Sequence, residues 1–426
     1  MVMKIMSKLA LLGGEPLITK TNSDYISLGT AEIELVNSVL ESQCLSGFFG
    51  GWCDGFYGGP KVQEFESEFS GRLGSKYAIS VNSNTSGLIA AIGAAGISPG
   101  DEVIVPPFSM SATAMAPLFY GGIPVFVDIE SDTFCLNPEL VNASITDKTR
   151  AIIAVNLFGH PAQLKSLRKI ADKHGIILIE DNAQAPFANE ENIDAGTIGH
   201  MGVFSFNYHK HIHTGEGGMV VTNDELLAKR LYAIRNHGEN VVEELGIDDI
   251  TNMIGFNFRM TELSAAVGLA QLKHADKHIN HRIKIAERLT SGTEGMEGII
   301  PPIARENCKH VYYCWAMKFD QNVVGVSREL FIKALVAEGF TLSNGYVKPL
   351  YMLPVFQSRK AIGRDGFPFN MTDRKYKAGI CEIAERMHTT EMCLYETCAH
   401  YLSDTDLDAM VDAFNKVYSN RNELLV

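Results

Sequence analysis

The sequence predicts an α/β fold in which a mostly parallel, doubly wound sheet forms a large domain and a smaller α+β domain follows it. Three observations lead to this expectation. Apolar runs typical of buried strands alternate with helical stretches between about residues 84 and 223, as in sheets built from strand–helix–strand units. One of these runs ends in two carboxylates, Glu180 and Asp181. The chain has 426 residues, 46% of them hydrophobic, and can therefore bury more than one core.

The expected strands are short and rich in Val and Ile, because the strands of a parallel sheet are buried on both faces. They cover residues 102–105, 124–127, 151–155, 176–179, 203–206 and 219–221, and a helix is expected over 163–174. Ligands of such sheets bind beyond the carboxyl ends of the strands. This edge of the sheet is where we expect the functional residues.

The second half of the chain changes character. A helix over residues 261–281 is expected to lead out of the large domain, and the β-rich segment 311–317 begins the later part. We therefore expect a large domain over residues 1–280 and a small C-terminal domain over 281–426.

Composition limits the classes of partner. The net charge is −13, and no run of Lys and Arg is interleaved with aromatic residues, which argues against a nucleic-acid partner. No stretch approaches the ~18 apolar residues of a membrane span, and Gly13 and Gly14 end the N-terminal apolar run too early for a signal segment. The eight cysteines are scattered without metal-site spacing, so we expect no metal, reduced thiols and a cytoplasmic protein.

Lys210 is the most informative residue of the chain. It lies between two strand-like segments, with the hydroxyl of Ser205 upstream and the glycine-rich turn 215–218 downstream. An amine in such a setting suits an imine bond with an aldehyde cofactor, which indicates pyridoxal 5'-phosphate. Asp181 then has a partner in a protonated pyridine nitrogen. Taken singly, a lysine in a polar turn is usually solvated and an aspartate after a strand usually caps a helix; their order along the chain favours the cofactor interpretation.

The chain resembles the DegT/DnrJ/EryC1/StrS family of pyridoxal-phosphate-dependent sugar aminotransferases, a branch of the fold-type I aminotransferases. The resemblance runs from about residue 60 to the C-terminal helix. Besides the Lys210 segment, the motifs that carry it are residues 59–66, 100–106, 124–129, 180–185 and 255–262. The resemblance implies a fold-type I architecture and an amino-group transfer.

The resemblance also implies a role for each residue near the cofactor ring. Lys210 holds the cofactor and later moves the substrate proton, and Asp181 pairs with the ring nitrogen. Gln184 matches the residue that contacts the ring hydroxyl, and a helical turn would place it on the face of Asp181. Met110 stands where the family has an aromatic residue over the ring, so either its sulfur or the nearby Phe108 is expected to cover that face.

The phosphate is expected at a helix N-terminus that begins near Asn84, Thr85 and Ser86, where N–H groups and the helix dipole favour an anion. Asn84 replaces the family's glycine, and asparagine tolerates left-handed backbone geometry. The resemblance assigns Ser205 to the same phosphate. It assigns Asn257 to the phosphate of the partner subunit, which implies a homodimer with shared active sites.

Two features stay open at this level. His209, His211 and His213 flank the lysine and either tune its pKa or are ordinary polar groups. The glycine- and aromatic-rich segment 47–59 suits a substrate lid or a plain surface loop.

The resemblance implies transfer of an amino group from L-glutamate or L-glutamine to a keto or aldehydo sugar. The long segment 47–59 is more typical of members acting on cyclitols or acidic sugars, and one candidate acceptor is 8-oxo-3,8-dideoxy-manno-octulosonate, whose 8-amino product belongs to lipopolysaccharide. Nucleotide-linked keto sugars and cyclitol ketones are alternatives. A sugar dehydratase, in which the family replaces the lysine by histidine, and a silent cofactor-binding regulator are disfavoured by Lys210, Asp181, Gln184 and Ser205.

Overall fold

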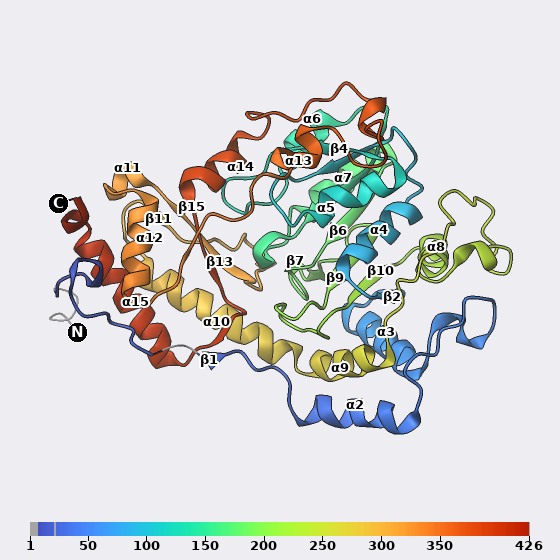
Figure 1. Cartoon of the computed structure of the whole chain (residues 1–426), viewed down its shortest axis with the longest axis horizontal. Helices are drawn as coiled ribbons and strands as arrows, with labels where there is room; N and C mark the ends of the chain where they lie inside the picture. Colours follow the sequence, from blue (N-terminus) through green and yellow to red (C-terminus); the bar gives the residue numbers. More distant parts are fainter. Residues whose placement is uncertain (1–6, 21–22, 426) are drawn as a thin grey trace.

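The structure is a computed structural model that describes residues 7–20 and 23–425. Two regions lie side by side, joined along one edge by a long helix, α10 (Ala275–Thr293) (Figure 1). A seven-stranded sheet forms the larger region, and a four-stranded sheet belongs to the smaller one. The expected α/β class with a mostly parallel sheet is confirmed.

The large sheet has the order β2-β10-β9-β6-β5-β3-β4. Five neighbouring strands run parallel, and β10 runs antiparallel to both β9 and β2. The edge strand β2 lies before the segment whose pattern predicted the sheet. The strands are β2 (Tyr77–Val81), β3 (Glu102–Val105), β4 (Ile123–Phe126), β5 (Thr149–Val155), β6 (Ile177–Asp181), β9 (Met201–Ser205) and β10 (Gly218–Thr222).

Helices cover this sheet. Those on β2, β9 and β10 are α4 (Asn84–Ala94) and α8 (Glu225–Arg235), while α7 (Leu164–His174) packs on β5 and β6. The remaining helices of this half of the chain are α2 (Thr30–Ser42), α3 (Pro60–Leu73), α5 (Ala112–Met115), α6 (Pro138–Ser144) and α9 (Glu262–Lys273). Two short sheets join distant segments: β1 (Ser23–Asp24) with β16 (His400–Tyr401), and β7 (Asn189–Glu190) with β8 (Ile193–Asp194) and β12 (Cys308–Lys309).

The small sheet has the order β11-β13-β15-β14 and separates two hydrophobic cores. Along β15 (Met392–Glu396), Met392 and Leu394 join the core of the large region, whereas Cys393 and Tyr395 join the second core. This alternation is the period of two of a strand whose faces are both covered. The other elements here are β11 (Ile299–Ile300), β13 (Cys314–Phe319), β14 (Ser343–Asn344), α11 (Gln321–Val324), α12 (Arg328–Ala337), α13 (Pro354–Gln357), α14 (Glu382–Arg386) and α15 (Asp404–Ser419).

The expectation of a single helix over residues 261–281 is wrong. The chain forms α9 and α10, which meet at His274, whose φ of −104° and ψ of 3° are not helical. Neither Gly nor Pro marks the break, so the sequence carries no local sign of it. The division of the chain after residue 280 stays a prediction, and this position lies within α10. In residues 7–20 and 23–425, no helix has the length and apolar character needed to cross a membrane.

A buried ion pair ties the edge of the large sheet to two helices. Arg235 of α8 is fully buried, and its Nη1 lies 2.5 Å from Oε1 of Glu66 on α3. The same carboxylate accepts the N–H of Ser80 in β2 at 2.8 Å. Removing one partner would leave an uncompensated charge in the interior.

We predict that Glu66→Ala lowers the free energy of unfolding by about 3–5 kcal/mol, the usual cost of breaking a buried pair. The matched control is Asp276→Ala, because Asp276 pairs with Arg72 at 2.9 Å on the surface; it should cost less than about 1 kcal/mol. Urea unfolding followed by circular dichroism measures both. Equal losses in the two variants would contradict the assignment.

Candidate active site

Most of the expected residues meet in one pocket of about 240 Å³ at the carboxyl ends of β6 and β9. Its walls come from both halves of the chain, since Tyr313 and Tyr346 also line it. The predicted residues among its lining are Asn84, Thr85, Met110, Asp181, Gln184, Ser205 and Lys210. Ser86 and Asn257 are not in this lining.

Asp181 is the last residue of β6 and is almost fully buried. Thr113 donates its hydroxyl to Oδ2 at 3.0 Å, the N–H of Ala183 donates to Oδ1 at 3.1 Å, and the Asn84 amide lies 3.4 Å away. Burial raises the pKa of Asp181 despite these donors and the positive charge of Lys210. A buried carboxylate with only neutral direct partners suits a cationic group in the pocket.

Lys210 lies in a turn closed by a bond from its N–H to the carbonyl of Asn207 at 3.0 Å. Its Nζ lies over the ring of Tyr313, 4.2 Å from the ring centre. Burial lowers the pKa of Lys210, and the charge of Asp181 is the main influence that opposes this shift. A lower pKa makes more of the nucleophilic free amine available.

Tyr313 was not predicted, and a backbone contact with the large region positions it. The N–H of Val311 donates to the carbonyl of Gly159 at 2.9 Å, and the Val311 carbonyl accepts from Nε2 of His211 at 2.8 Å. Gly159 has a φ of +97°, and a Cβ there would lie 2.6 Å from the nitrogen of Tyr312. Only glycine allows this approach. The run of aromatic residues near 313 gives no sign in the sequence that one of them reaches Lys210.

Gln184 connects the two halves of the pocket. Its Oε1 accepts the N–H of Phe158 at 2.8 Å, and its Nε2 donates to the hydroxyl of Tyr346 at 3.0 Å. The helical turn expected after Asp181 is absent from residues 182–187, which form turns. Gln184 nevertheless reaches the pocket, because a turn also reverses the chain within a few residues.

The predicted helix N-terminus is present as α4. Its N-cap Ser83 accepts the N–H of Ser86 at 3.0 Å, and the Ser86 hydroxyl donates to Asn82 at 2.5 Å. The side chain of Ser86 is thereby committed to the cap. Asn84 is the first helical residue, so the left-handed geometry expected for it is wrong.

Met110 takes the place of the aromatic residue that the family has over the cofactor ring. Met110 lines the pocket and is 63% exposed, whereas Phe108 is fully buried and lies edge-on to Tyr346. Phe108 is not in the lining, so Met110 is the expected residue that can cover a bound ring.

The three histidines have different surroundings. His209 lines the pocket, and burial lowers its pKa. His211 is buried against Val311, and burial lowers its pKa to about 3. His213 bonds to the hydroxyl of Ser27 at 2.7 Å. Only His209 is therefore placed to meet a ligand.

Asn257 is exposed, and its Oδ1 accepts a bond from Nε of Arg259 at 2.7 Å. Its place outside the pocket of its own chain leaves the expected contact with a partner subunit as a prediction.

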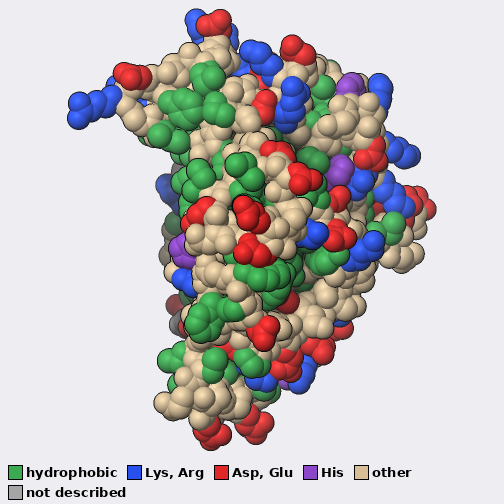
Figure 2. Space-filling model, turned by 90° about the vertical axis from the view of Figure 1, so that its right-hand side faces the viewer, with side chains coloured by type: hydrophobic (Ala, Val, Ile, Leu, Met, Phe, Trp, Pro, Cys, Tyr) green, Lys and Arg blue, Asp and Glu red, His purple; other side chains and the backbone are tan. Residues whose placement is uncertain are grey.

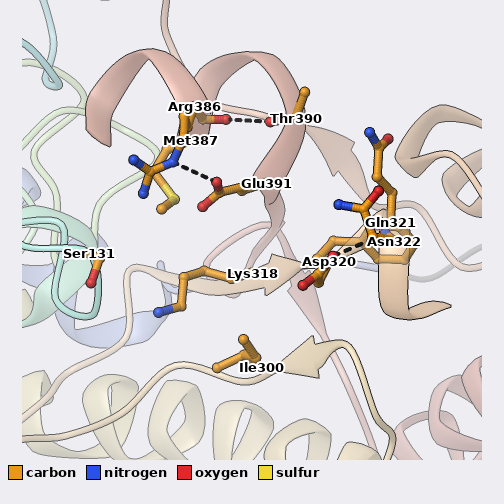
Figure 3. A pocket seen from close by; sticks show the side chains of 11 residues that line it. Ser131, Ile300, Lys318, Asp320, Gln321, Asn322, Arg386, Met387, Thr390 and Glu391 are labelled. Carbon is orange, nitrogen blue, oxygen red and sulfur yellow. Dashed lines mark hydrogen bonds and ion pairs between the residues drawn. The ribbon is translucent and has the colours of Figure 1, made fainter. Parts of the chain in front are cut away.

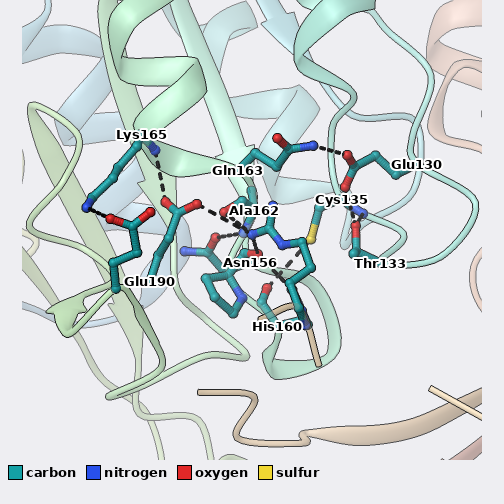
Figure 4. Close-up of polar contacts among 12 residues, drawn as sticks. Glu130, Thr133, Cys135, Asn156, His160, Ala162, Gln163, Lys165 and Glu190 are labelled. Atoms are coloured by element: carbon teal, nitrogen blue, oxygen red, sulfur yellow. Dashed lines mark hydrogen bonds and ion pairs between the residues drawn. The ribbon is translucent and has the colours of Figure 1, made fainter. Parts of the chain in front are cut away.

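A polar network that includes Asn156, His160 and Ala162 fixes the loop that follows β5 (Figure 4). Asn156 donates to Asn182 at 2.6 Å and accepts the N–H of Ala162 at 2.7 Å. His160 accepts the N–H of Arg305 at 3.0 Å, and burial lowers its pKa to about 4. The network thus anchors the chain at Arg305, five residues before His310, in the segment that leads to Tyr313.

A second hollow lies between β13 and α14, with a volume of about 360 Å³ (Figure 3). Its cationic groups are already paired, Lys318 with Asp132 at 2.5 Å and Arg386 with Glu391 at 2.8 Å. These two pairs leave neither cation free to bind a ligand. The Lys210 pocket is therefore the better candidate for the active site.

The donor set of the Lys210 pocket fits pyridoxal phosphate. Lys210 offers an amine for the aldehyde and Asp181 offers a carboxylate for the ring nitrogen. The hydroxyls of Thr85 and Ser205, near the N-terminus of α4, suit the phosphate. Within residues 7–20 and 23–425, no group of three or more His, Cys, Asp or Glu side chains is arranged to hold a metal ion.

Comparisons with known proteins agree on one family. The family model described as the DegT/DnrJ/EryC1/StrS aminotransferase family matches residues 42–393. A putative L-glutamine:3-amino-2,3-dideoxy-scyllo-inosose aminotransferase of Streptoalloteichus tenebrarius is 35% identical over 430 residues, covering 98% of this chain and 99% of the relative. GDP-perosamine synthase of Caulobacter vibrioides is 33% identical over 296 residues, covering 69% and 78%. The X-ray structure of the aminotransferase from Psychrobacter cryohalolentis matches with a TM-score of 0.82 at 28% identity, covering 94% of this chain and 99% of that chain.

The raised pKa of Asp181 predicts a pH-dependent loss of folding stability in the protein without cofactor. Folding disfavours the ionised carboxylate relative to its protonated form. The loss of stability is complete above the folded pKa and is absent below the unfolded value of about 4. Asp181→Asn should therefore make the cofactor-free protein more stable at about pH 7, with the gain declining toward about pH 4.

Urea unfolding across this pH range measures the effect. Asp147→Asn, in the exposed turn before β5, is the control and should show no such pH-dependent gain. A variant less stable than wild type at neutral pH would contradict the cost assigned to Asp181.

Proposed function

The chain belongs to the DegT/DnrJ/EryC1/StrS aminotransferase family and is a pyridoxal-phosphate-dependent sugar aminotransferase, and on that premise we propose that it moves an amino group from L-glutamate or L-glutamine to the carbonyl carbon of a sugar or cyclitol. The expected fold-type I architecture is confirmed by the match to solved aminotransferases. The observation that carries the proposal is the meeting of Lys210 and Asp181 in one pocket beside a helix N-terminus.

Pyridoxal phosphate, when bound, supplies an aldehyde that condenses with amines and a ring that takes up the electrons of a breaking C–H bond. Asp181 would keep the ring nitrogen protonated, and Thr113, Ala183 and Asn84 hold its carboxylate in place. Lys210 would bind the aldehyde and, once displaced by the donor, move the proton at the substrate carbon. Its lowered pKa suits a group that must both take up and release that proton.

The phosphate would be held by the hydroxyls of Thr85 and Ser205. Ser86 contributes through Ser83, because its N–H and hydroxyl bond to the side chain of this N-cap, at the helix N-terminus that attracts the anion. Met110 would cover the open face of the ring, and Gln184 would meet the ring hydroxyl with the amide group that now bonds to Tyr346.

Several acceptors fit this reaction. A relative that matches nearly the whole chain is named for a cyclitol ketone, and another is named for a GDP-linked sugar. The aldehyde of 8-oxo-3,8-dideoxy-manno-octulosonate, the lipopolysaccharide precursor considered from the sequence, is a third candidate. A dehydratase is the rival reaction, and the presence of Lys210 in the pocket favours transamination over it.

We predict that the enzyme transfers the α-amino nitrogen of ¹⁵N-labelled glutamine or glutamate to one of these three acceptors. Mass spectrometry of the products reads the label. Lys210→Ala should lose at least about a thousandfold in rate, because both the covalent link and the proton transfer depend on this amine. A deoxygenated, unlabelled product would instead identify a dehydratase, and unchanged transfer by Lys210→Ala would refute the role of the lysine.

We propose that the working unit is a homodimer in the cytoplasm, where the eight free cysteines stay reduced. Large hydrophobic side chains are exposed in the loops near α3 and α8, among them Phe49, Trp52, Ile250 and Ile254. Hydrophobic side chains also gather on the face shown in Figure 2. Burial of such a surface against a second copy would bring Asn257 to the phosphate of the partner's site.

Mixed dimers test this arrangement. Lys210→Ala and Asn257→Asp proteins should each have little activity, the second because a carboxylate repels the phosphate. A mixed dimer with shared sites contains one site with both native residues, so mixing should restore up to half of the wild-type activity per mixed dimer. Mixed dimers that form but stay inactive would show that Asn257 serves its own chain or no site.

A further inference from the structure

The aromatic ring of Tyr313 lies under the amine of Lys210, inside the pocket of the candidate active site. Tyr313 lines this pocket and is 7% exposed, and the Nζ of Lys210 lies 4.2 Å from the centre of its ring. An ammonium group within about 6 Å of the centre of an aromatic face is attracted by the negative charge of that face. The contact therefore acts directly on the atom that performs the chemistry.

Backbone contacts on both sides fix the position of this ring. Two residues before it, the N–H of Val311 donates to the carbonyl of Gly159 at 2.9 Å. The carbonyl of Tyr313 itself accepts the N–H of Thr397 at 3.3 Å and the hydroxyl of Thr397 at 3.1 Å. The fold thus sets the place of the ring, and the flexible side chain of Lys210 moves relative to it.

The charged groups around Lys210 differ from the ring in their other commitments. Burial lowers the pKa of Lys210, and the charge of Asp181 is the largest influence that opposes this shift. The other titratable groups that face the amine are Cys314, Cys398 and Glu396, which also favour its charged form, and His209 and Glu216 of the pocket lining. Asp181 is assigned to the ring nitrogen of the cofactor, whereas Tyr313 contacts the amine itself.

The proposed reaction makes Lys210 carry a charge in this buried setting. Once the donor displaces it, its amine removes the proton from the α-carbon of the donor and becomes an ammonium, while the electron pair of the broken C–H bond passes into the cofactor. The ammonium then gives that proton to the cofactor carbon to which the lysine had been joined. Between the two transfers the charged amine must stay within reach, although burial disfavours its charge.

We propose that Tyr313 is a positioning residue, the face of whose ring holds the charged amine of Lys210 in the pocket between these two proton transfers. This inference rests on the proposed function and adds to it a residue that the small region supplies. The attraction depends on the face of the ring and not on its hydroxyl. Burial raises the pKa of Tyr313, so the hydroxyl stays protonated and adds no negative charge of its own.

Graded fluorination of the ring tests the proposal. Tyr313→Phe, and phenylalanines with one, two or three ring fluorines incorporated at position 313, nearly keep the shape of the ring, while each fluorine withdraws charge from its face. In cofactor-free protein, trace acetylation with acetic anhydride across a range of pH, read at Lys210 by mass spectrometry, reports the fraction of neutral amine. Tyr313→Phe should match wild type. Three fluorines should lower the ratio of charged to neutral amine about tenfold at a given pH.

Tyr418 offers the matched control, because the guanidinium of Arg421 lies over its ring at the same distance of 4.2 Å. Fluorinated phenylalanines at position 418 should leave the acetylation of Lys210 unchanged. Acetylation of Lys210 that does not respond to fluorine at position 313 would overturn the proposal.

Transfer of the ¹⁵N label by holoenzyme gives the second readout. As fluorines are added at position 313, kcat should fall step by step, whereas KM for the donor should change little, because the charged amine forms only after the donor has bound. Equal loss of kcat in Tyr313→Phe and in all its fluorinated forms would indicate a role for the hydroxyl and would contradict the proposal. If wild-type protein transfers no label to any acceptor, the proposed function fails, and the acetylation of cofactor-free protein still decides whether the ring holds the charged amine.

Discussion

A carboxylate held inside the protein is the constraint on which the site depends. Asp181 lies at the end of a central parallel strand, where it is almost fully buried and, within the described residues, accepts hydrogen bonds from three neutral donors. Holding this charge without a cation costs the fold free energy. The arrangement is useful once a cationic ring nitrogen lies opposite, and the same carboxylate then sets the position of the ring relative to Lys210.

The small region completes a pocket that the large sheet cannot close alone. The chain is anchored by Arg305 at His160 and by Val311 at Gly159, and it then places the ring of Tyr313 under the amine of Lys210. Gln184 and Tyr346 form a second contact across the pocket. The lysine therefore responds to both halves of the chain, and movement of one half against the other would alter its surroundings.

Local patterns predicted the parts of the site that are local. The strand before Asp181, the turn of Lys210 and the cap of α4 each depend on a few neighbouring residues, and the structure has all three. Tyr313 was missed, because a sequence does not show which side chains a distant segment brings to the pocket. The break at His274 has no Gly or Pro to mark it. Asn84 was misjudged because it is the first residue of α4, directly after the N-cap Ser83, and no left-handed turn precedes the helix there.

Reduction of the cofactor bond tests the central claim most directly. Purified protein loaded with pyridoxal phosphate is treated with borohydride and digested, and the peptides are identified by mass spectrometry. The account predicts a pyridoxyl group on Lys210, in the tryptic peptide that runs through the blocked Lys210 to Lys229, and none in Lys210→Ala protein. A pyridoxyl group on another lysine, or stable cofactor binding with no lysine modified, would contradict it.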